Sequence, residues 1–443
     1  MARLGASMNS TASPTISHSS SANSPRAVNG IDLVETASVR LLESPAVSKM
    51  LDDLKADDAR TLAEQRAIAE IPAPPFQESA RAEYCQKRFA GLGLKETAID
   101  AAGNFIGLRR GTGHGPKLVV SAHLDTVFPP GTNVAVTEDN GVLRGAGIGD
   151  NARGLAALLS VLRMINTHGV NTIGDLMWVA TVGEEELGNL RGVKALFHDH
   201  QDIDGFVAID GLKITRLINQ ATGSRRYQMI FKGPGGHSFA EFGRPSAIHA
   251  MGRAIATISE LRPPADPKTT FTVGTVSGGT SVNAIANEAR MAIDIRSNSV
   301  AELLKLESEV IAIVQAGVID ENRRWSSDQI GVECNLIGDR PAGITAENSP
   351  IVAAARRSLT ATTGEPHIAL AASSTDANLP MSLGVPAVTI AGGGEGGNQH
   401  SRNEWYKPTN AYFGPQNALL TVLTLVGLAG VSTPALPRRT NAM

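Results

Sequence analysis

Three apolar runs in this chain lead into a histidine or a carboxylate, and this pattern constrains the fold more than any other feature. The runs span residues 117–125, 175–183 and 205–210. A continuous apolar run of this length is typical of a strand that is buried on both faces. Segments with helical periodicity separate the runs, which predicts an open, mostly parallel α/β sheet with flanking helices. Functional sites in such sheets form outside the carboxyl ends of the strands.

A glycine-rich loop at 143–154 brings one carboxylate, Asp150, to the start of a helix. Apolar residues recur at three- and four-residue steps after Arg153, which predicts an amphipathic helix. An acidic residue in this position is often only a cap, because exposed backbone N–H groups and the helix dipole stabilise an anion there. By itself, Asp150 therefore fits either a helix cap or a functional carboxylate.

The length of 443 residues predicts more than one domain, because single cores stop growing at a smaller size. Between about 217 and 339 the order of the predicted elements changes to βαββαβ, which is the ferredoxin-like unit. We expect this unit to be inserted within the larger domain. The predicted organisation is a disordered leader at 1–28, the larger domain at 29–216 and 340–432, the inserted domain at 217–339 and a tail at 433–443.

The composition argues against two classes of partner. A net charge of −3 gives no positive surface for nucleic acid or an anionic membrane. The apolar run at 418–431 is shorter than the ~20 residues that a membrane span needs, so we interpret it as a packed helix. The two cysteines, Cys85 and Cys334, lack metal-site spacing and fit a reducing compartment, so we expect a cytoplasmic location.

His123 and Asp125 stand two residues apart on a predicted strand, so their side chains leave the same face. This spacing lets the carboxylate reach the far nitrogen of a metal-bound imidazole and fix its tautomer. The alternative is a polar strand end without a ligand.

Three adjacent glutamates follow the second apolar run, at 184–186. Their charges repel one another, which indicates a cation nearby, although a solvated helix start would also explain them. Asp210 precedes Gly211, a pair that a turn alone would explain. His400 follows a glycine-rich stretch that could cradle a phosphate, but no nucleotide-binding motif accompanies it.

Five of these residues form a set that suits metal ions. Two imidazoles and three carboxylates are ligands that Zn²⁺ and other divalent first-row ions accept. With one carboxylate bridging, the set would hold two ions, as in two-metal hydrolases. The five are His123, Asp150, Glu185, Asp210 and His400.

The chain resembles the co-catalytic zinc metallopeptidase family of peptidase T, carboxypeptidase G, acetylornithine deacetylase and succinyl-diaminopimelate desuccinylase. The resemblance covers roughly residues 65–415, and the stretch at 373–390 is most similar to the peptidase T-like branch. Five motifs carry it in the family's order: SAHLDT at 121–126, GAGIGDNARG at 145–154, GEE at 183–185, GPGGHS at 233–238 and HSRNE at 400–404.

The resemblance implies a role for each candidate. Asp150 would bridge two divalent ions, most often zinc, with cobalt or manganese as alternatives, and the peptide bond to Asn151 would be cis. Glu184 would be the general base, and Asp125 would assist catalysis beside it. Of the remaining ligands, His123 and Asp210 would hold one ion, and Glu185 and His400 would hold the other.

The family usually has a polar residue before its two glutamates, whereas Gly183 stands there in this chain. The base and ligand could therefore be Glu185 and Glu186 instead of Glu184 and Glu185. We prefer the earlier pair, because it follows the strand end directly.

The resemblance also implies a homodimer whose inserted domain is a dimerisation and lid domain. His237 would reach across the dimer to the reacting carbonyl, and Asn283 and Arg296 would contact the substrate. We expect a peptidase T-like aminopeptidase or tripeptidase, with an N-acyl amino acid deacylase as the alternative. A non-catalytic metal-containing binding protein is the alternative from a different class.

Overall fold

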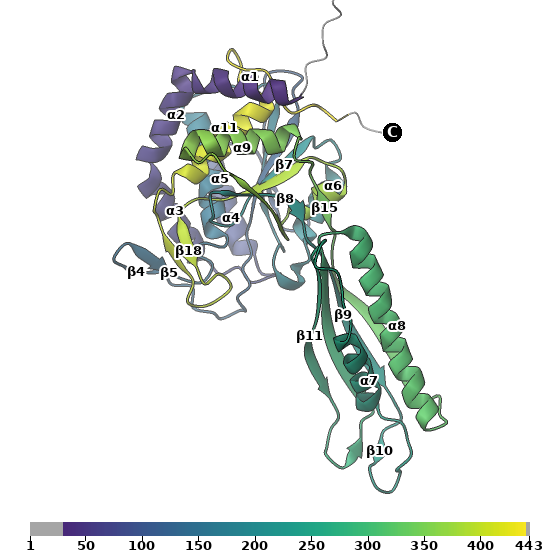
Figure 1. Ribbon diagram of the computed structural model, residues 1–443. Coiled ribbons are helices and arrows are strands. Elements are labelled where there is room, and N and C mark those ends of the chain that lie inside the picture. The colour runs from purple at the N-terminus through teal and green to yellow at the C-terminus, as the bar shows by residue number, and fades with distance from the viewer. Residues whose placement is uncertain (1–29, 440–443) are drawn as a thin grey trace, which may run out of the picture.

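The computed structural model describes residues 30–439. The leader predicted at 1–28 and the last residues of the predicted tail lie outside this range. Figure 1 shows a larger domain and an elongated inserted domain that projects from one side of it. Separate hydrophobic cores support the two parts.

A central sheet with parallel middle strands forms the larger domain. Strands β6, β3, β7 and β17 run in one direction, which confirms the predicted mostly parallel sheet. Among the described residues the order is β1-β2-β6-β3-β7-β17-β8-β15, with β16 paired to β8. The strands are β1 (Glu96–Ile99), β2 (Phe105–Arg109), β3 (Lys117–His123), β6 (Asp175–Thr181), β7 (Gly205–Ile209), β8 (Arg216–Ala221), β15 (Gly343–Ile344), β16 (Ala369–Ser373) and β17 (Ala387–Ile390).

Side chains of the middle strands alternate between two cores. Val120 of β3 and Trp178 of β6 pack into one core, whereas Val119 and Val179 beside them pack into the other. A strand that is covered on both faces reads as a continuous apolar run. This burial explains why the apolar runs predicted these strands.

Helices cover both faces of the sheet. Helices α6 (Arg191–Asp199) and α10 (Asn378–Ser382) lie on one face. The apolar run at 418–431 lies mostly in α11 (Phe413–Val426), and among residues 30–439 no helix is long and apolar enough to cross a membrane. The helices of the other face are α1 (Gly30–Leu42), α2 (Pro45–Ala56), α3 (Asp58–Ala69), α4 (Ser79–Gly91), α5 (Ala152–Thr167), α9 (Pro350–Thr363) and α11 (Phe413–Val426).

A small antiparallel sheet joins two distant loops of the larger domain. Its order is β18-β19-β5-β4 within the described chain. The pairing of β5 with β19 holds the glycine-rich loop at 145–150 beside the segment at 398–404. The strands are β4 (Thr137–Asp139), β5 (Val142–Arg144), β18 (Glu395–Gly397) and β19 (Trp405–Lys407).

The inserted domain has the predicted βαββαβ order. Its antiparallel sheet is arranged β11-β13-β9-β14, and both of its long helices pack on one face. The elements are β9 (Gly223–Lys232), α7 (Ala247–Ser259), β11 (Thr269–Gly278), β13 (Glu288–Ser297), α8 (Val300–Arg324) and β14 (Gly331–Arg340). The boundary predicted at 217 needs correction, because β8 pairs within the large sheet and the inserted sheet begins at Gly223.

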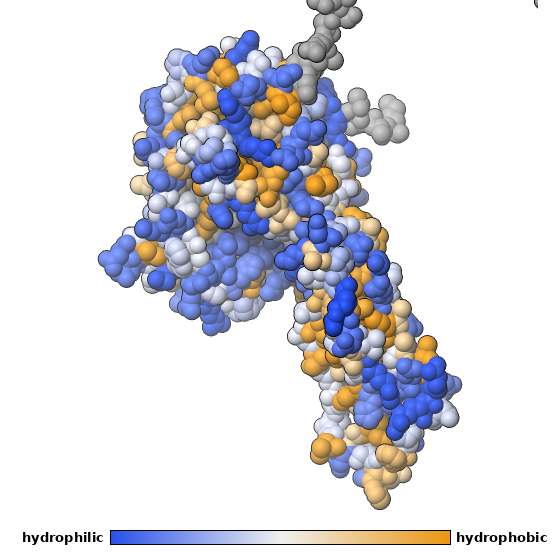
Figure 2. All heavy atoms as spheres, viewed as in Figure 1, coloured by the Kyte–Doolittle hydropathy of each residue, from blue (hydrophilic) through white to orange (hydrophobic). Residues whose placement is uncertain are grey.

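The far end of the inserted domain carries exposed apolar side chains. The short strands β10 (Gly236–His237) and β12 (Ala284–Ile285) pair there. Phe239 is 88% exposed and Phe242 is 79% exposed. Figure 2 shows apolar surface at this end of the domain, on the side that it displays.

Candidate metal centre and active site

The predicted histidine and aspartate at two neighbouring strand ends come together. His123 is the last residue of β3, and Asp210 follows β7, which lies beside β3. The Nε2 atom of His123 lies 3.1 Å from Asp150 Oδ1 and 3.8 Å from Asp210 Oδ1. Three residues from separate segments therefore meet at the carboxyl edge of the sheet, as the α/β pattern predicts.

The loop that carries Asp150 is held by a carboxylate that the sequence analysis quoted in a motif without giving it a role. Glu404 accepts hydrogen bonds from the backbone N–H groups of Gly147, Gly149 and Asp150, at 2.9, 2.8 and 3.0 Å. The pairing of β5 with β19 brings these two segments together. Glu404 thus holds the backbone that presents the Asp150 side chain.

Asn151, not Asp150, caps helix α5. The Asn151 Oδ1 atom accepts from the Gly154 N–H at 3.1 Å, and its Nδ2 donates to the Ile209 carbonyl at 2.9 Å. The Asp150–Asn151 peptide bond is cis, as the resemblance implied. The simple capping role considered for Asp150 is therefore wrong, and its carboxylate remains available for the site.

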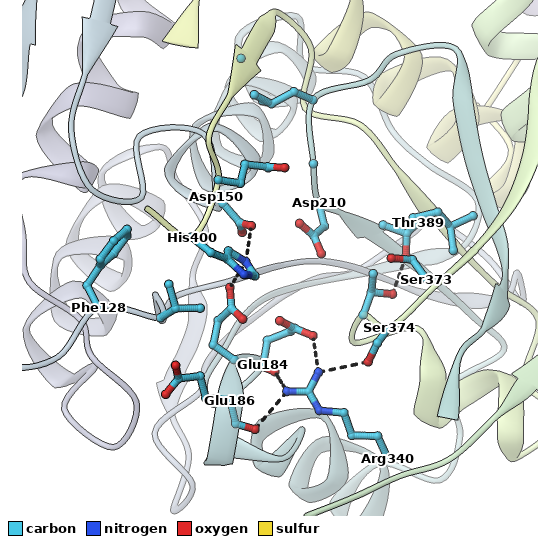
Figure 3. Close-up of a pocket in the computed structure, with 18 of the residues that line it drawn as sticks. Phe128, Asp150, Glu184, Glu186, Asp210, Arg340, Ser373, Ser374, Thr389 and His400 are labelled. Atoms are coloured by element: carbon cyan, nitrogen blue, oxygen red, sulfur yellow. Dashed lines mark hydrogen bonds and ion pairs between the residues drawn. The ribbon is translucent and has the colours of Figure 1, made fainter. Parts of the chain in front are cut away.

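Each oxygen of Asp150 faces a different histidine. While Oδ1 faces His123, Oδ2 lies 3.2 Å from His400 Nε2. The same His400 nitrogen lies 3.2 Å from Glu185 Oε1. Figure 3 shows His400 between Asp150 and the glutamates, with Asp210 pointing into the same space. This is the arrangement expected of a carboxylate that bridges two cations.

The cluster requires positive charge to balance its buried carboxylates. Burial alone would raise the pKa of Asp150, but hydrogen bonds to His123 and His400 hold it well below its usual range. Hydrogen bonds to Asp150 and Glu185 raise the pKa of His400 to about 11. Burial raises the pKa of Glu185. Without another cation, protons on the histidines must compensate these acids.

The donor set fits divalent metal ions. Ligand atoms of His123, Asp150 and Glu185 all lie within 4.8 Å of one another. Imidazole nitrogen with carboxylate oxygen is a common environment for zinc and related ions. Divalent ions would supply the positive charge that this cluster of acids needs.

Asp125 approaches His123 with both its backbone carbonyl and its carboxylate. The His123 Nδ1 atom lies 3.0 Å from the backbone carbonyl of Asp125 and 3.7 Å from its carboxylate. The carboxylate also accepts from the backbone N–H groups of Glu184 and Glu185, at 3.0 and 2.7 Å. The backbone carbonyl thus faces His123, and the carboxylate lies near the same imidazole while it holds the glutamate loop.

The three adjacent glutamates occupy different environments. Glu184 is buried and pairs with Arg340, whereas Glu185 reaches His400. Glu186 is exposed, and Figure 3 shows its carboxylate turned away from His400. Gly183 before them has φ 68°, a left-handed conformation that favours glycine. This geometry supports the Glu184 and Glu185 assignment over the shifted pair.

A family model independently matches residues 119–416, which include every candidate metal ligand. The chain belongs to peptidase family M20/M25/M40. This is a family of dinuclear metal-dependent hydrolases of amide bonds, so the chain is a metallopeptidase or deacylase enzyme. The family predicted from the five motifs is confirmed.

Individual members of the family resemble the chain in sequence or in fold. A succinyl-diaminopimelate desuccinylase from Xanthomonas euvesicatoria is 26% identical over 279 residues, 58% of this chain and 73% of that protein. A Staphylococcus aureus tripeptidase matches 83% of this chain and 98% of its own, with 24% identity and a TM-score of 0.69. The aminopeptidase PepT of Bacillus cereus also matches 83% of this chain and 98% of its own, with 21% identity and a TM-score of 0.67.

A cavity of about 1010 Å³ lies between the two domains of this family member. Asp150, Glu184, Glu185, Asp210 and His400 line it from the larger domain. The inserted domain contributes four charged side chains, Arg226, Asp294, Arg296 and Arg340. Arg296 was predicted to contact substrate, and it lies in this cavity.

His237 and Asn283 do not line this cavity. His237 lies on β10 at the far end of the inserted domain (Figure 1). Asn283 immediately precedes β12, the strand that pairs with β10. The Nδ1 atom of His237 accepts from the backbone N–H groups of Phe239 and Ala240, at 3.3 and 3.2 Å. This leaves Nε2 as the nitrogen that can donate to another molecule.

Sequence reasoning gave no role to several side chains around the centre. Arg340 binds Glu184, Glu404 holds the Asp150 loop, and the buried Asp376 accepts a hydrogen bond from Thr181 at the end of β6. The three adjacent glutamates predicted a nearby cation, and Arg340 is that cation. Its identity was hidden because 156 residues separate it from Glu184.

Proposed function

We propose that the chain hydrolyses an amide bond in small peptides or N-acyl amino acids with two divalent ions per chain. The observation that carries this proposal is Asp150, whose two carboxylate oxygens face different histidines while a buried glutamate stands beside them. We assign His123 and Asp210 to one ion and Glu185 and His400 to the other. Zinc is the ion that we propose, with cobalt or manganese as alternatives.

His123, Asp150, Glu185, Asp210 and His400 would hold divalent ions, which would supply Lewis acidity for the amide carbonyl and for the attacking water. Glu184 would accept a proton from that water and pass it to the leaving amine. Burial raises the pKa of Glu184 well above its usual value, against the opposing effect of Arg340. A base with a raised pKa holds a proton more readily during turnover, which suits this double role.

The partner subunit would complete the active site. His237 and Asn283 lie away from the cavity of their own chain, and His237 Nε2 is free to donate a hydrogen bond. Exposed Phe239 and Phe242 beside them would be covered in a homodimer. We propose that the partner's His237 stabilises the oxyanion of the reacting carbonyl, while Arg296 of the same chain binds the substrate carboxylate.

Two activities share this chemistry. The fold likeness to a tripeptidase and PepT favours a peptidase T-like aminopeptidase or tripeptidase, and the sequence likeness to a desuccinylase favours an N-acyl amino acid deacylase. A metal-containing binding protein is disfavoured, because it would have no use for Glu184. Cys85 and Cys334 are both free, which supports a cytoplasmic location.

A substrate panel on the metal-loaded protein tests the proposal. The panel contains tripeptides, dipeptides, N-acetyl amino acids and N-succinyl amino acids. We expect metal-dependent release of an amine from at least one class, and the class that is hydrolysed distinguishes peptidase from deacylase. Metal binding without hydrolysis of any member would contradict the proposed function.

A further inference from the structure

The cavity beside the metal centre is lined by as many acids as lysines and arginines, but most of those acids belong to the proposed metal site or are already paired. Six lysine and arginine side chains line it. Only one of them, Arg340, is paired with a glutamate of the proposed catalytic set. The others are Lys213, Arg216, Arg226, Arg296 and Arg402.

Two of these cations share one carboxylate on the inserted domain. Asp294 accepts from Arg226 Nε at 3.3 Å and from Arg296 Nε at 2.6 Å. Asp294 pairs with Arg226 across strands β13 and β9, on the sheet face away from the helices. One carboxylate between two guanidinium groups leaves a positive charge on this wall of the cavity. This positively charged wall suits a carboxylate of the substrate.

A second group of cations lies on the larger domain, next to the metal ligands. Lys213 follows Asp210 by three residues, and Arg402 follows His400 by two. The two loops adjoin, because the Leu212 side chain packs directly against Gly396. Lys213 and Arg402 therefore flank the proposed metal centre on neighbouring segments.

This second group has no acidic partner within residues 30–439. No hydrogen bond or ion pair joins the side chain of Lys213 or of Arg402 to another described residue. Arg216 is half-buried, and the only described partner of its side chain is the backbone carbonyl of Ala372, at 2.9 Å. Unpaired cations facing one cavity repel each other, and an anionic ligand would relieve that repulsion.

The cavity offers little for the positive amine of an unblocked peptide. Of its acids, Asp150, Glu185 and Asp210 belong to the proposed metal site, and Glu184 and Asp294 are paired with arginines. Glu186 is left, and it is exposed. A neutral or positively charged part of a substrate, placed beside Lys213 and Arg402, would leave these two cations without a partner.

We propose that the substrate carries two anionic groups, one held by Arg226 and Arg296 and the other by Lys213 and Arg402, with Arg216 reinforcing the second subsite. This inference rests on the proposed amide hydrolysis. It narrows the substrate class to N-acyl amino acids whose acyl group ends in a carboxylate. The first subsite takes the amino acid carboxylate, and the second takes the acyl carboxylate.

A pair of matched ligands tests the second subsite without turnover. The ligands are N-succinyl-L-alanine and N-succinamoyl-L-alanine, which have the same shape and differ only in the terminal carboxylate. Binding to the metal-loaded, full-length Glu184→Gln protein is measured by calorimetry. We expect the succinyl ligand to bind roughly tenfold more tightly, as a charge-assisted hydrogen bond allows.

Variants then locate the effect. In the Lys213→Gln/Arg402→Gln background the ratio of the two dissociation constants should fall towards one, while succinamoyl binding stays the same. Arg296→Gln should weaken both ligands to the same extent, because both keep the alanine carboxylate. The exposed pair Lys87→Gln/Lys95→Gln is the matched charge control and should leave the ratio unchanged.

The outcomes separate this inference from the proposed function. Three results would overturn the inference. They are a ratio of dissociation constants near one in the parent, a ratio that the Lys213 and Arg402 substitutions leave unchanged, and failure to bind either ligand. Hydrolysis of neutral substrates together with a ratio near one would leave the proposed function intact. The expected ratio without hydrolysis of any substrate would uphold the subsite and contradict the proposed function.

Discussion

Arg340 and Glu184 form an ion pair in which both side chains are only 6% exposed, with Nη1 3.1 Å from Oε1. Arg340 also donates to the backbone carbonyl of Glu184 and, at 3.1 Å, to the Ser374 hydroxyl. It is the last residue of β14, the final strand of the inserted domain. The inserted domain is thereby bonded directly to the proposed general base.

Replacement of Arg340 by methionine should impair the base and shift the pH dependence. The arginine lowers the pKa of Glu184 against the effect of burial, so its loss raises that pKa further. Because the base must be ionised to act, the acidic limb of kcat/KM should move to higher pH. We expect about a ten- to hundredfold loss that is largest at low pH.

The pH profile of kcat/KM is the measurement for this substitution. Arg340→Lys should restore part of the profile, because it retains the charge. Arg356→Met, which removes an arginine from the exposed pair with Glu347, is the matched control. A uniform loss across the pH range would show that Arg340 acts only through folding.

Asp376 should make the stability of the metal-free protein depend on pH. Its Oδ2 accepts from the Thr181 hydroxyl, its Oδ1 has no described partner, and burial raises its pKa to about 6. The unfolded value is about 3.9, so the folded protein binds the proton more tightly. Stability should therefore fall as pH rises from about 4 to 6, by on the order of 3 kcal/mol.

Urea unfolding of the chelator-treated protein over this pH range measures that contribution. In Asp376→Asn the side chain no longer titrates, so the difference in unfolding free energy between variant and parent should change with pH in favour of the variant. If the two stability curves stay parallel, Asp376 does not titrate in this way.

Glu404→Gln should weaken metal binding although Glu404 is not itself a proposed ligand. The amide cannot accept all three of the backbone N–H bonds that hold the loop at 147–150. Supporting residues of this kind typically contribute about ten- to a hundredfold in metal affinity. Competition with a coloured chelator measures the change, and Glu395→Gln on the exposed part of the same segment should have no effect.

The proposed dimer predicts complementation between two inactive variants. Glu184→Gln retains His237, and His237→Ala retains Glu184, so a hybrid dimer contains one complete site. Mixing the purified variants under conditions that exchange subunits should restore up to about a quarter of the parental activity. Full activity of His237→Ala alone, or no recovery on mixing, would contradict a role across the dimer.

The sequence predicted best those features that one short segment contains. His123 and Asp210 each terminate an apolar run, so periodicity alone indicated where they lie. The two helices and four long strands of the inserted domain also follow local periodicity. Their order was therefore recognisable before the structure.

Features that depend on distant segments were harder to predict. The boundary at 217 was wrong because only the pairing of β8 with β16 and β17, which are distant in sequence, assigns it to the large sheet. Asp125 approaches His123 as their shared face predicts, but no local pattern indicated that its carboxylate also accepts two backbone N–H groups from another loop. His237 belongs to a recognisable motif, yet only the long inserted sheet places it away from the cavity.

Metal content and turnover of Glu184→Gln test the central claim most directly. The account predicts two divalent ions per chain in the parent and in this variant, with turnover reduced by about a thousandfold in the variant alone. Glu185→Gln serves as the comparison and should lose metal together with activity. Parental turnover in Glu184→Gln, or a parent that binds no divalent ion, would contradict the account.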